Sequence, residues 1–223
     1  MDILLSLLIG TINQMAIMII AFKMFRFPAL SYVRDFLLIA SVLSLISYFN
    51  RFILDIPQFD AAVQYIVLVV FFRIFFEFRL YEATLVIATG CAIFTCIKVV
   101  TLSLFLKTNV LSFDDLVHLT GLKMMLIQLL VDVLVVVVAW LVSKLNTGYS
   151  FMSQPPHNLN YKLKKNMLSY LLIIAAGLVV FVMSTYSYIM SISQANLFVV
   201  FAYGVTPLVI LLWLLTKKDY ESI

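Results

Sequence analysis

Two ionisable residues lie deep inside long apolar stretches, where they could carry chemistry. Lys98 belongs to the stretch 80–106 and Asp132 to the stretch 121–144. A charged group inside a membrane span is costly, so it usually has a partner or faces a wet cavity, and by default it marks a functional site. At 1.5 Å per residue, Lys98 falls about 12 Å and Asp132 about 16 Å below the outer ends of their stretches. We therefore expect an ion pair between Lys98 and Asp132 on consecutive antiparallel helices.

Further polar side chains fall at a comparable depth in other apolar stretches. They are Asn13, Gln14, Gln128 and Thr206. With Lys98 and Asp132 they predict a polar cluster in the outer half of the protein, which either binds a ligand or holds the helices together by hydrogen bonds. Gly204 and Pro207 mark a predicted hinge, because proline removes a backbone donor and can kink a helix.

A cysteine–histidine membrane peptidase, of the kind that processes cyclic pheromones, is one enzyme that the residue types suggest. Cys91, Cys96 and His118 are present, but both cysteines lie toward the middle of the stretch 80–106 and His118 follows its outer end. This geometry disfavours the pairing that activates a thiol. The sequence has no glycine-rich phosphate loop, paired-histidine zinc motif or serine elbow. We expect no enzymatic activity, no cofactor and no metal site.

The composition places these residues in a membrane protein. Hydrophobic residues make up 64% and charged residues 12% of the chain, and the mean hydropathy is +1.11. Seven apolar stretches are each about long enough to cross a hydrocarbon core. They cover residues 3–22, 34–54, 60–78, 80–106, 121–144, 167–190 and 196–216. They lack the two-residue alternation of barrel strands, so we expect an all-α, polytopic membrane helical bundle, with residues 1–223 forming a single transmembrane domain of about seven helices.

The basic residues alternate between the two ends of these stretches. Eleven of the fifteen fall on one side if the N-terminus is outside, and Arg51, Lys107 and Lys123 fall on the other. The eleven are Lys23, Arg26, Arg34, Arg73, Arg79, Lys144, Lys162, Lys164, Lys165, Lys217 and Lys218. This bias predicts an N-out, C-in orientation and removes the need for nucleic acid to explain the positive charge.

The connecting segments carry further expectations. Basic and aromatic residues alternate from Lys23 to Pro28, which favours a position at the lipid headgroups. Arg73 and Glu77 are one helical turn apart and are expected to pair within one helix. Residues 112–119 are expected to form a short amphipathic helix on the outer surface, and residues 145–166 form the long cytoplasmic loop.

Two segments invite comparison with a known family, Phe22–Pro28 (FKMFRFP) and Asp55–Asp60 (DIPQFD). With about six or seven helices, short loops and the N-out, C-in arrangement, the chain resembles the membrane sensor region of Agr-type peptide-pheromone histidine kinases, or a related short membrane protein of bacilli. The resemblance is topological. The catalytic region of the kinases is missing, and no functional residue of the family can be transferred. It implies a multi-pass protein of a bacterial plasma membrane.

Three hypotheses about function follow from these observations. The first is a receptor-like or accessory protein that senses an extracellular or membrane-partitioned ligand, such as a peptide, and signals through a separate membrane or cytosolic partner. The second is a transport component in which Lys98 and Asp132 contact a small solute or a coupling proton. The third is a structural or assembly protein embedded in the lipid bilayer. The sequence leaves the oligomeric state open.

Overall fold

The computed structural model describes residues 3–54, 56–108, 110, 122–152, 167–192 and 197–222. Over these residues the fold is all-helical, as predicted, with seven α-helices and no strand. The helices are α1 (Ile3–Met24), α2 (Val33–Tyr48), α3 (Pro57–Phe75), α4 (Leu80–Lys107), α6 (Leu122–Leu145), α7 (Met167–Ile192) and α8 (Leu197–Ser222). Each of the seven apolar stretches overlaps one of them. The predicted amphipathic helix at 112–119 and most of the 145–166 loop lie outside the described residues.

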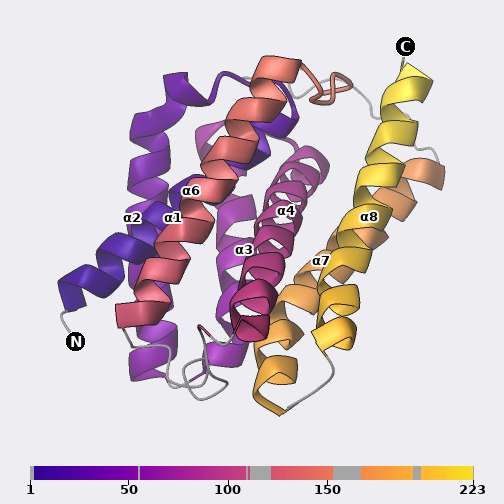
Figure 1. Cartoon of the computed structure of the whole chain (residues 1–223). Helices are drawn as coiled ribbons and strands as arrows, with labels where there is room; N and C mark the ends of the chain where they lie inside the picture. The colour runs from indigo at the N-terminus through magenta and orange to yellow at the C-terminus, as the bar shows by residue number, and fades with distance from the viewer. Residues whose placement is uncertain are drawn as a thin grey trace.

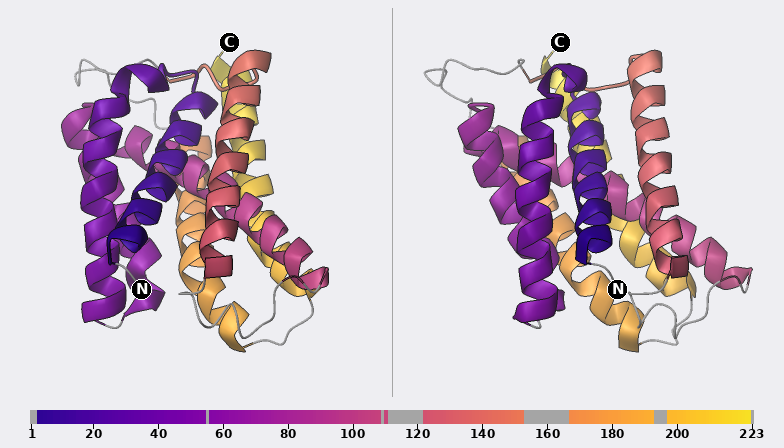
Figure 2. Two further views of the ribbon diagram at one scale, coloured as in Figure 1. Left: turned by 60° about the vertical axis from the view of Figure 1, so that its left-hand side comes forward. Right: turned by 90° about the vertical axis from the view of Figure 1, so that its left-hand side faces the viewer.

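Helix α4 forms the centre of the bundle (Figures 1 and 2). It packs against α1, α3, α6, α7 and α8, whereas α1 also packs against α2 and α6, and α7 pairs with α8. Nearly every side chain of α4 from Ala83 to Thr95 is buried. A helix that is apolar on all sides is expected in such a central position. The C-terminus lies at the end of the bundle at which α6 ends, and the N-terminus lies toward the opposite end (Figure 2).

Four helical segments of the described chain are long and apolar enough to cross a membrane. They are Ile3–Met24, Ala29–Ile53, Leu80–Lys107 and Lys123–Leu145. Many of their large apolar side chains are exposed on the bundle surface, including Leu4, Leu38, Leu126 and Val133. Exposed apolar area on this scale is unfavourable in water and suits a lipid solvent. The length and composition of these helices therefore support the prediction that the chain is a membrane protein.

The ends of α2 and α3 differ from the predicted ranges. Helix α2 passes at Phe49 into a π-helical turn, Phe49–Ile53. Helix α3 begins earlier than predicted, because Pro57 suits a first helical turn, where its missing N–H is not needed. It ends at Phe75, and Glu77 has a positive φ of 54°. The expected intrahelical Arg73–Glu77 pair is wrong, because Glu77 lies beyond the end of the helix.

The aromatic residues of the first loop belong to the protein core. Phe25 and Phe27 are each 1% exposed. The ring of Phe22, itself fully buried, makes edge contacts with six rings from the segment between α1 and α2, from helices α2 and α3, and from the turn between α3 and α4. These partners are Phe27, Tyr32, Phe36, Phe72, Phe76 and Phe78. The expectation that this loop lies at the lipid headgroups through its aromatic rings is therefore wrong, because the rings pack on one another.

Residues 146–151, which we call the clasp, tie three separate parts of the chain together. Arg26 donates from Nε to the Gly148 carbonyl at 2.6 Å and from a terminal nitrogen to the Asn146 carbonyl at 2.7 Å. The Tyr149 amide donates to the Met24 carbonyl at 2.7 Å. A Cβ at Gly148 would lie 2.9 Å from that same Met24 oxygen, so glycine permits the approach. The clasp thus fixes the end of α6 against the end of α1.

The other side of the clasp holds the C-terminal end of α8. The Asp219 carboxylate accepts hydrogen bonds from the Ser150 and Phe151 amides at 2.8 and 3.1 Å. The Tyr149 hydroxyl donates to the Leu212 carbonyl at 3.2 Å. Helices α1, α6 and α8 therefore cannot move independently at this end while the clasp is formed.

The clasp should loosen at high pH through Tyr149. Burial raises the pKa of the Tyr149 hydroxyl above its usual value, with the hydrogen bond to Thr216 acting in the opposite sense. The neutral phenol is therefore favoured in the folded protein, so its contribution to stability is complete below about pH 10 and is lost as pH rises through the raised pKa. Unfolding of the wild type and of Tyr149→Phe in detergent, compared from pH 8 to 11, checks this. The wild type should lose more stability over that range than the variant, and parallel curves would contradict the assignment.

Candidate functional site

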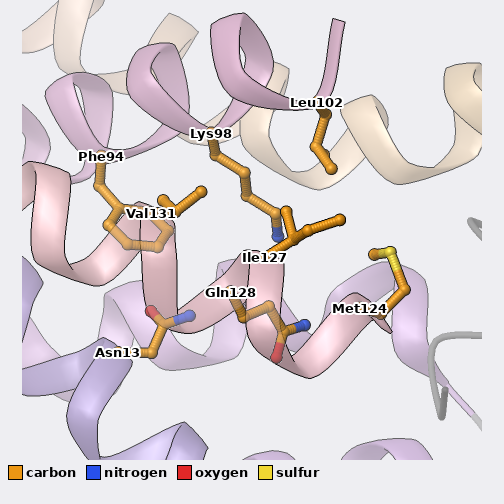
Figure 3. Close-up of a pocket in the computed structure, with 8 residues that line it drawn as sticks. All are labelled: Asn13, Phe94, Lys98, Leu102, Met124, Ile127, Gln128 and Val131. Atoms are coloured by element: carbon orange, nitrogen blue, oxygen red, sulfur yellow. The ribbon is translucent and has the colours of Figure 1, made fainter. Parts of the chain in front are cut away.

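A pocket lies between α1, α4 and α6 and brings together three of the predicted polar residues. Asn13 comes from α1, Lys98 from α4 and Gln128 from α6 (Figure 3). Apolar side chains from α4 and α6 complete its wall, namely Phe94, Leu102, Met124, Ile127 and Val131. The pocket has an empty volume of about 260 Å³, which includes space open to the outside, and it has room for about one water molecule.

Helical spacing explains why these residues share one space. Phe94, Lys98 and Leu102 recur every four residues on α4, so they lie on one face. On α6, Met124, Gln128 and Val131 are separated by four and then three residues, which also keeps them on one face. The packing of α1 against both helices then places Asn13 opposite Lys98 and Gln128. The sequence predicted these residues at a common depth, and the structure places them around one pocket.

The polar groups of the pocket have no partners within the described part of the protein. The Lys98 ammonium and the side-chain amides of Asn13 and Gln128 make no hydrogen bond or ion pair with any described residue. Lys98 is partly buried, and its side chain extends toward Ile127 and Gln128 in the close-up (Figure 3). A cation in this position, without a counterion, needs water or a ligand to satisfy it.

The predicted ion pair between Lys98 and Asp132 is not formed. Asp132 is buried, at 2% exposed, and neither carboxylate oxygen has a hydrogen-bond partner among the described residues. Lys98 and Asp132 act on each other only through space. Depth along a helix does not fix how far the helix is rotated about its axis. A buried carboxylate without donors is costly, so Asp132 is an unsatisfied group beside the pocket.

A second polar cluster, not anticipated from the sequence, surrounds Asp60 on the other side of α1. Asp60 is 1% exposed and accepts hydrogen bonds from four side chains. The donors are Ser47 at 2.8 Å, Asn50 at 3.3 Å, Arg51 at 2.6 Å and Gln64 at 2.8 Å. Arg51–Asp60 is the ion pair that the described residues show. From the sequence, Arg51 is identified only as a basic residue on the outer side of the membrane.

The Asp60 cluster reaches α1 through Gln14. Gln14 donates to the side-chain oxygen of Gln64, which in turn donates to Asp60. Gln14 follows Asn13 directly, so α1 presents one amide to the pocket and the next to the Asp60 cluster. The π-helical turn contributes Asn50 and Arg51 to the same carboxylate, and such turns often occur at functional sites. Asp60 and Gln64, four residues apart beside a polar end of α2, were the sequence signal for this cluster.

The remaining predicted site residues do not join the pocket. Thr206 is exposed on α8, a helix that packs on α4 and α7. Helix α8 continues without a break through Pro207. The structure does not describe the contacts of Gly204, so the hinge at Gly204 and Pro207 stays a prediction. Cys91 is buried and Cys96 partly buried, both as free thiols. His118 is outside the described residues, and no metal-binding group of side chains is found among those that are described.

Comparison of the chain with protein-family models, with curated proteins and with solved structures gives no match. The site must therefore be interpreted from its own geometry.

Proposed function

We propose that this chain is a seven-span protein of a bacterial plasma membrane, with its N-terminus outside and its C-terminus inside. The positive-inside bias supports this orientation. The clasp also supports it, because its hydrogen bonds bring the loop after α1, the end of α6 and the end of α8 together. Lys23, Arg26, Lys144, Lys217 and Lys218 lie in or next to these three segments, so basic residues assigned to one side do lie at one end.

Labelling of single cysteines in intact cells tests the orientation. In a Cys91→Ala, Cys96→Ala background, Thr108→Cys should react with a membrane-impermeant maleimide from outside. Thr147→Cys and Tyr220→Cys should react only after the cells are permeabilised. All three native side chains are exposed at the helix ends, so access is decided by the membrane. The reverse pattern would contradict the orientation.

In this orientation in the membrane, the protein acts as a receptor-like or accessory component that binds a ligand in the pocket and signals through a separate partner. The observation that carries this proposal is the set of three polar side chains, from three helices, that face one pocket and have no partner among the described residues. Side chains that serve only to join helices would bond one another across the interface.

The clasp supplies a route from the pocket to a cytosolic partner. Helices α1 and α6 line the pocket in one half of the bundle, and their other ends are held to each other and to α8 by the clasp. The space in the pocket is small, so a ligand larger than water must separate α1 from α6 or α4. That separation would strain the clasp and shift the end of α8, where a partner could detect it.

Ligand binding by the protein in lipid nanodiscs tests this role. The probes are decyl amphiphiles and short hydrophobic peptides with neutral, anionic or cationic ends. We expect saturable binding of at least one probe and, on binding, faster hydrogen exchange at the clasp amides of Tyr149 and Phe151. The Gln128→Phe side chain fills the pocket, so this variant should lose the binding and the change in hydrogen exchange. Val136→Phe, on the exposed surface of α6, is the matched control. Binding that is absent or survives Gln128→Phe would leave a structural role as the better account.

A transport component is the second candidate, and the unpartnered Asp132 carboxylate favours it. A buried carboxylate beside a polar pocket can exchange a proton with a solute or with water. Electrical currents from proteoliposomes on a solid support separate the two roles. Transport predicts a probe-induced current that Asp132→Asn abolishes, whereas a receptor binds the same probes without current.

A further inference from the structure

We infer that the pocket between α1, α4 and α6 recognises the terminal carboxylate of an amphipathic ligand, with Lys98 as its charged contact and Asn13 and Gln128 as flanking hydrogen-bond donors. This inference rests on the ligand-binding role proposed above and names the chemical class that the site takes.

The unused donors of the pocket define the head of the ligand. An ammonium offers three N–H groups and each side-chain amide offers two. None of these donors has a partner among the described residues, and the lysine charge has no direct counterion. An anion with two acceptor oxygens can accept hydrogen bonds from the Lys98 ammonium and from one of the side-chain amides at the same time. Hydrogen bonds of this kind to a charged group are among the stronger ones in proteins.

The size and walls of the pocket define the rest of the ligand. The space in the pocket is small, so a compact head group such as a carboxylate enters with less separation of the helices than a phosphate or sulfate does. Five of the eight lining side chains are apolar, and all five of these are buried. A ligand that leaves this small space must continue along apolar surface, so its body is an acyl chain or a run of apolar residues.

Three other charged groups act on Lys98 through space, namely Arg51, Asp60 and Asp132. Arg51 opposes the positive charge of Lys98, whereas Asp132 and Asp60 favour it. Asp132 also repels an anion beside Lys98, because like charges repel, and it is not a lining residue of the pocket. These two effects of Asp132 oppose each other, so its replacement by asparagine should change carboxylate binding by less than about threefold.

Matched pairs of probes test the head group in nanodiscs at pH 8. One pair is decanoate and decanamide, and the other is an N-acetylated Phe-Leu-Phe tripeptide with a free or an amidated C-terminus. We expect each carboxylate to bind at least tenfold more tightly than its amide. Lys98→Met should remove that preference while leaving amide binding within about threefold, and Lys98→Arg should retain most of it. The probe pair with the larger preference for the carboxylate over the amide shows whether the body of the ligand is an acyl chain or a peptide.

Several results would overturn carboxylate recognition. Equal binding of acid and amide by the wild type would do so while leaving the ligand-binding role intact, and absence of binding by all four probes would remove both. A tenfold loss in Asp132→Asn would show that the ligand presents a cation to Asp132. If Lys98→Met does not fold, Asn13→Leu and Gln128→Leu serve in its place. Each should reduce the preference about threefold or more, and an unchanged preference in both would count against the proposal.

Discussion

Asp60→Leu is expected to destabilise the folded protein by about 3 kcal/mol or more, because four side-chain donors lose their common buried acceptor at once. Asp60 is 1% exposed and receives hydrogen bonds from Ser47, Asn50, Arg51 and Gln64. Leucine has the same branched outline as aspartate but is larger, so it leaves no cavity, and the loss combines the missing hydrogen bonds and charge with some overpacking. Unfolding by sodium dodecyl sulfate or heat in mild detergent measures it.

Two further variants separate the parts of this cluster. Arg51→Met removes a guanidinium whose side chain is 44% exposed, so it should cost much less than Asp60→Leu. Asp60→Asn keeps one acceptor oxygen and should fall between the two. Glu221→Leu, at an exposed position on α8, is the control for losing an acidic side chain and should change stability little. Asp60→Leu with wild-type stability would show that the four donors find water or other partners.

Gly90→Val is expected to be the most disruptive single change in the packing of α1 on α4. A Cβ at Gly90 would lie 2.7 Å from the Ala21 Cβ, 2.9 Å from the Ile17 carbonyl oxygen and 3.2 Å from the Ala21 Cα. Two of these atoms are backbone, so the helices must separate. Overpacking of this kind costs about 1–3 kcal/mol, and the branched side chain of valine places the cost at the upper end or beyond.

The same substitution should also change the pocket. Helices α1 and α4 supply Asn13 and Lys98, so their separation moves these groups apart. Gly90→Val should therefore lower the unfolding midpoint and weaken the binding of any pocket ligand, as measured in the nanodisc assay. Gly177→Val on α7 is the matched control, because a Cβ there meets nothing within 4 Å. Equal effects of the two variants would show that intrinsic helix propensity, rather than the α1–α4 contact, sets the cost.

The structure also changes how the charge of Arg51 is understood. Counting basic residues treats Arg51 only as a sign of orientation, yet its guanidinium binds the buried Asp60 carboxylate, which is linked through Gln64 to Gln14. Helix α1 thus contributes to two kinds of polar site. The Asp60 carboxylate has its hydrogen bonds satisfied by neighbouring side chains, and its cluster is suited to holding α1, α2 and α3 together. The Lys98 pocket has unused donors and is suited to a ligand.

The sequence by itself determined the helices and the depth of their polar residues. Long apolar runs, interrupted by charged and helix-breaking segments, specify where helices form, because a backbone in lipid must satisfy its own hydrogen bonds. Regular helical rise then places Asn13, Lys98 and Gln128 at similar depths, and the spacing on α4 and α6 predicts which neighbours share their face.

Only the tertiary structure decided which of these polar groups meet. The rotation of each helix about its axis depends on side-chain packing with several neighbours at once, and no local pattern encodes it. That rotation buries Asp132 without a hydrogen bond to Lys98, and it turns Asp60 inward to four donors. Packing likewise draws Phe25 and Phe27 into the core. Aromatic and charged residues near helix ends suit either an interface or a buried contact, and the choice depends on what the rest of the fold places beside them.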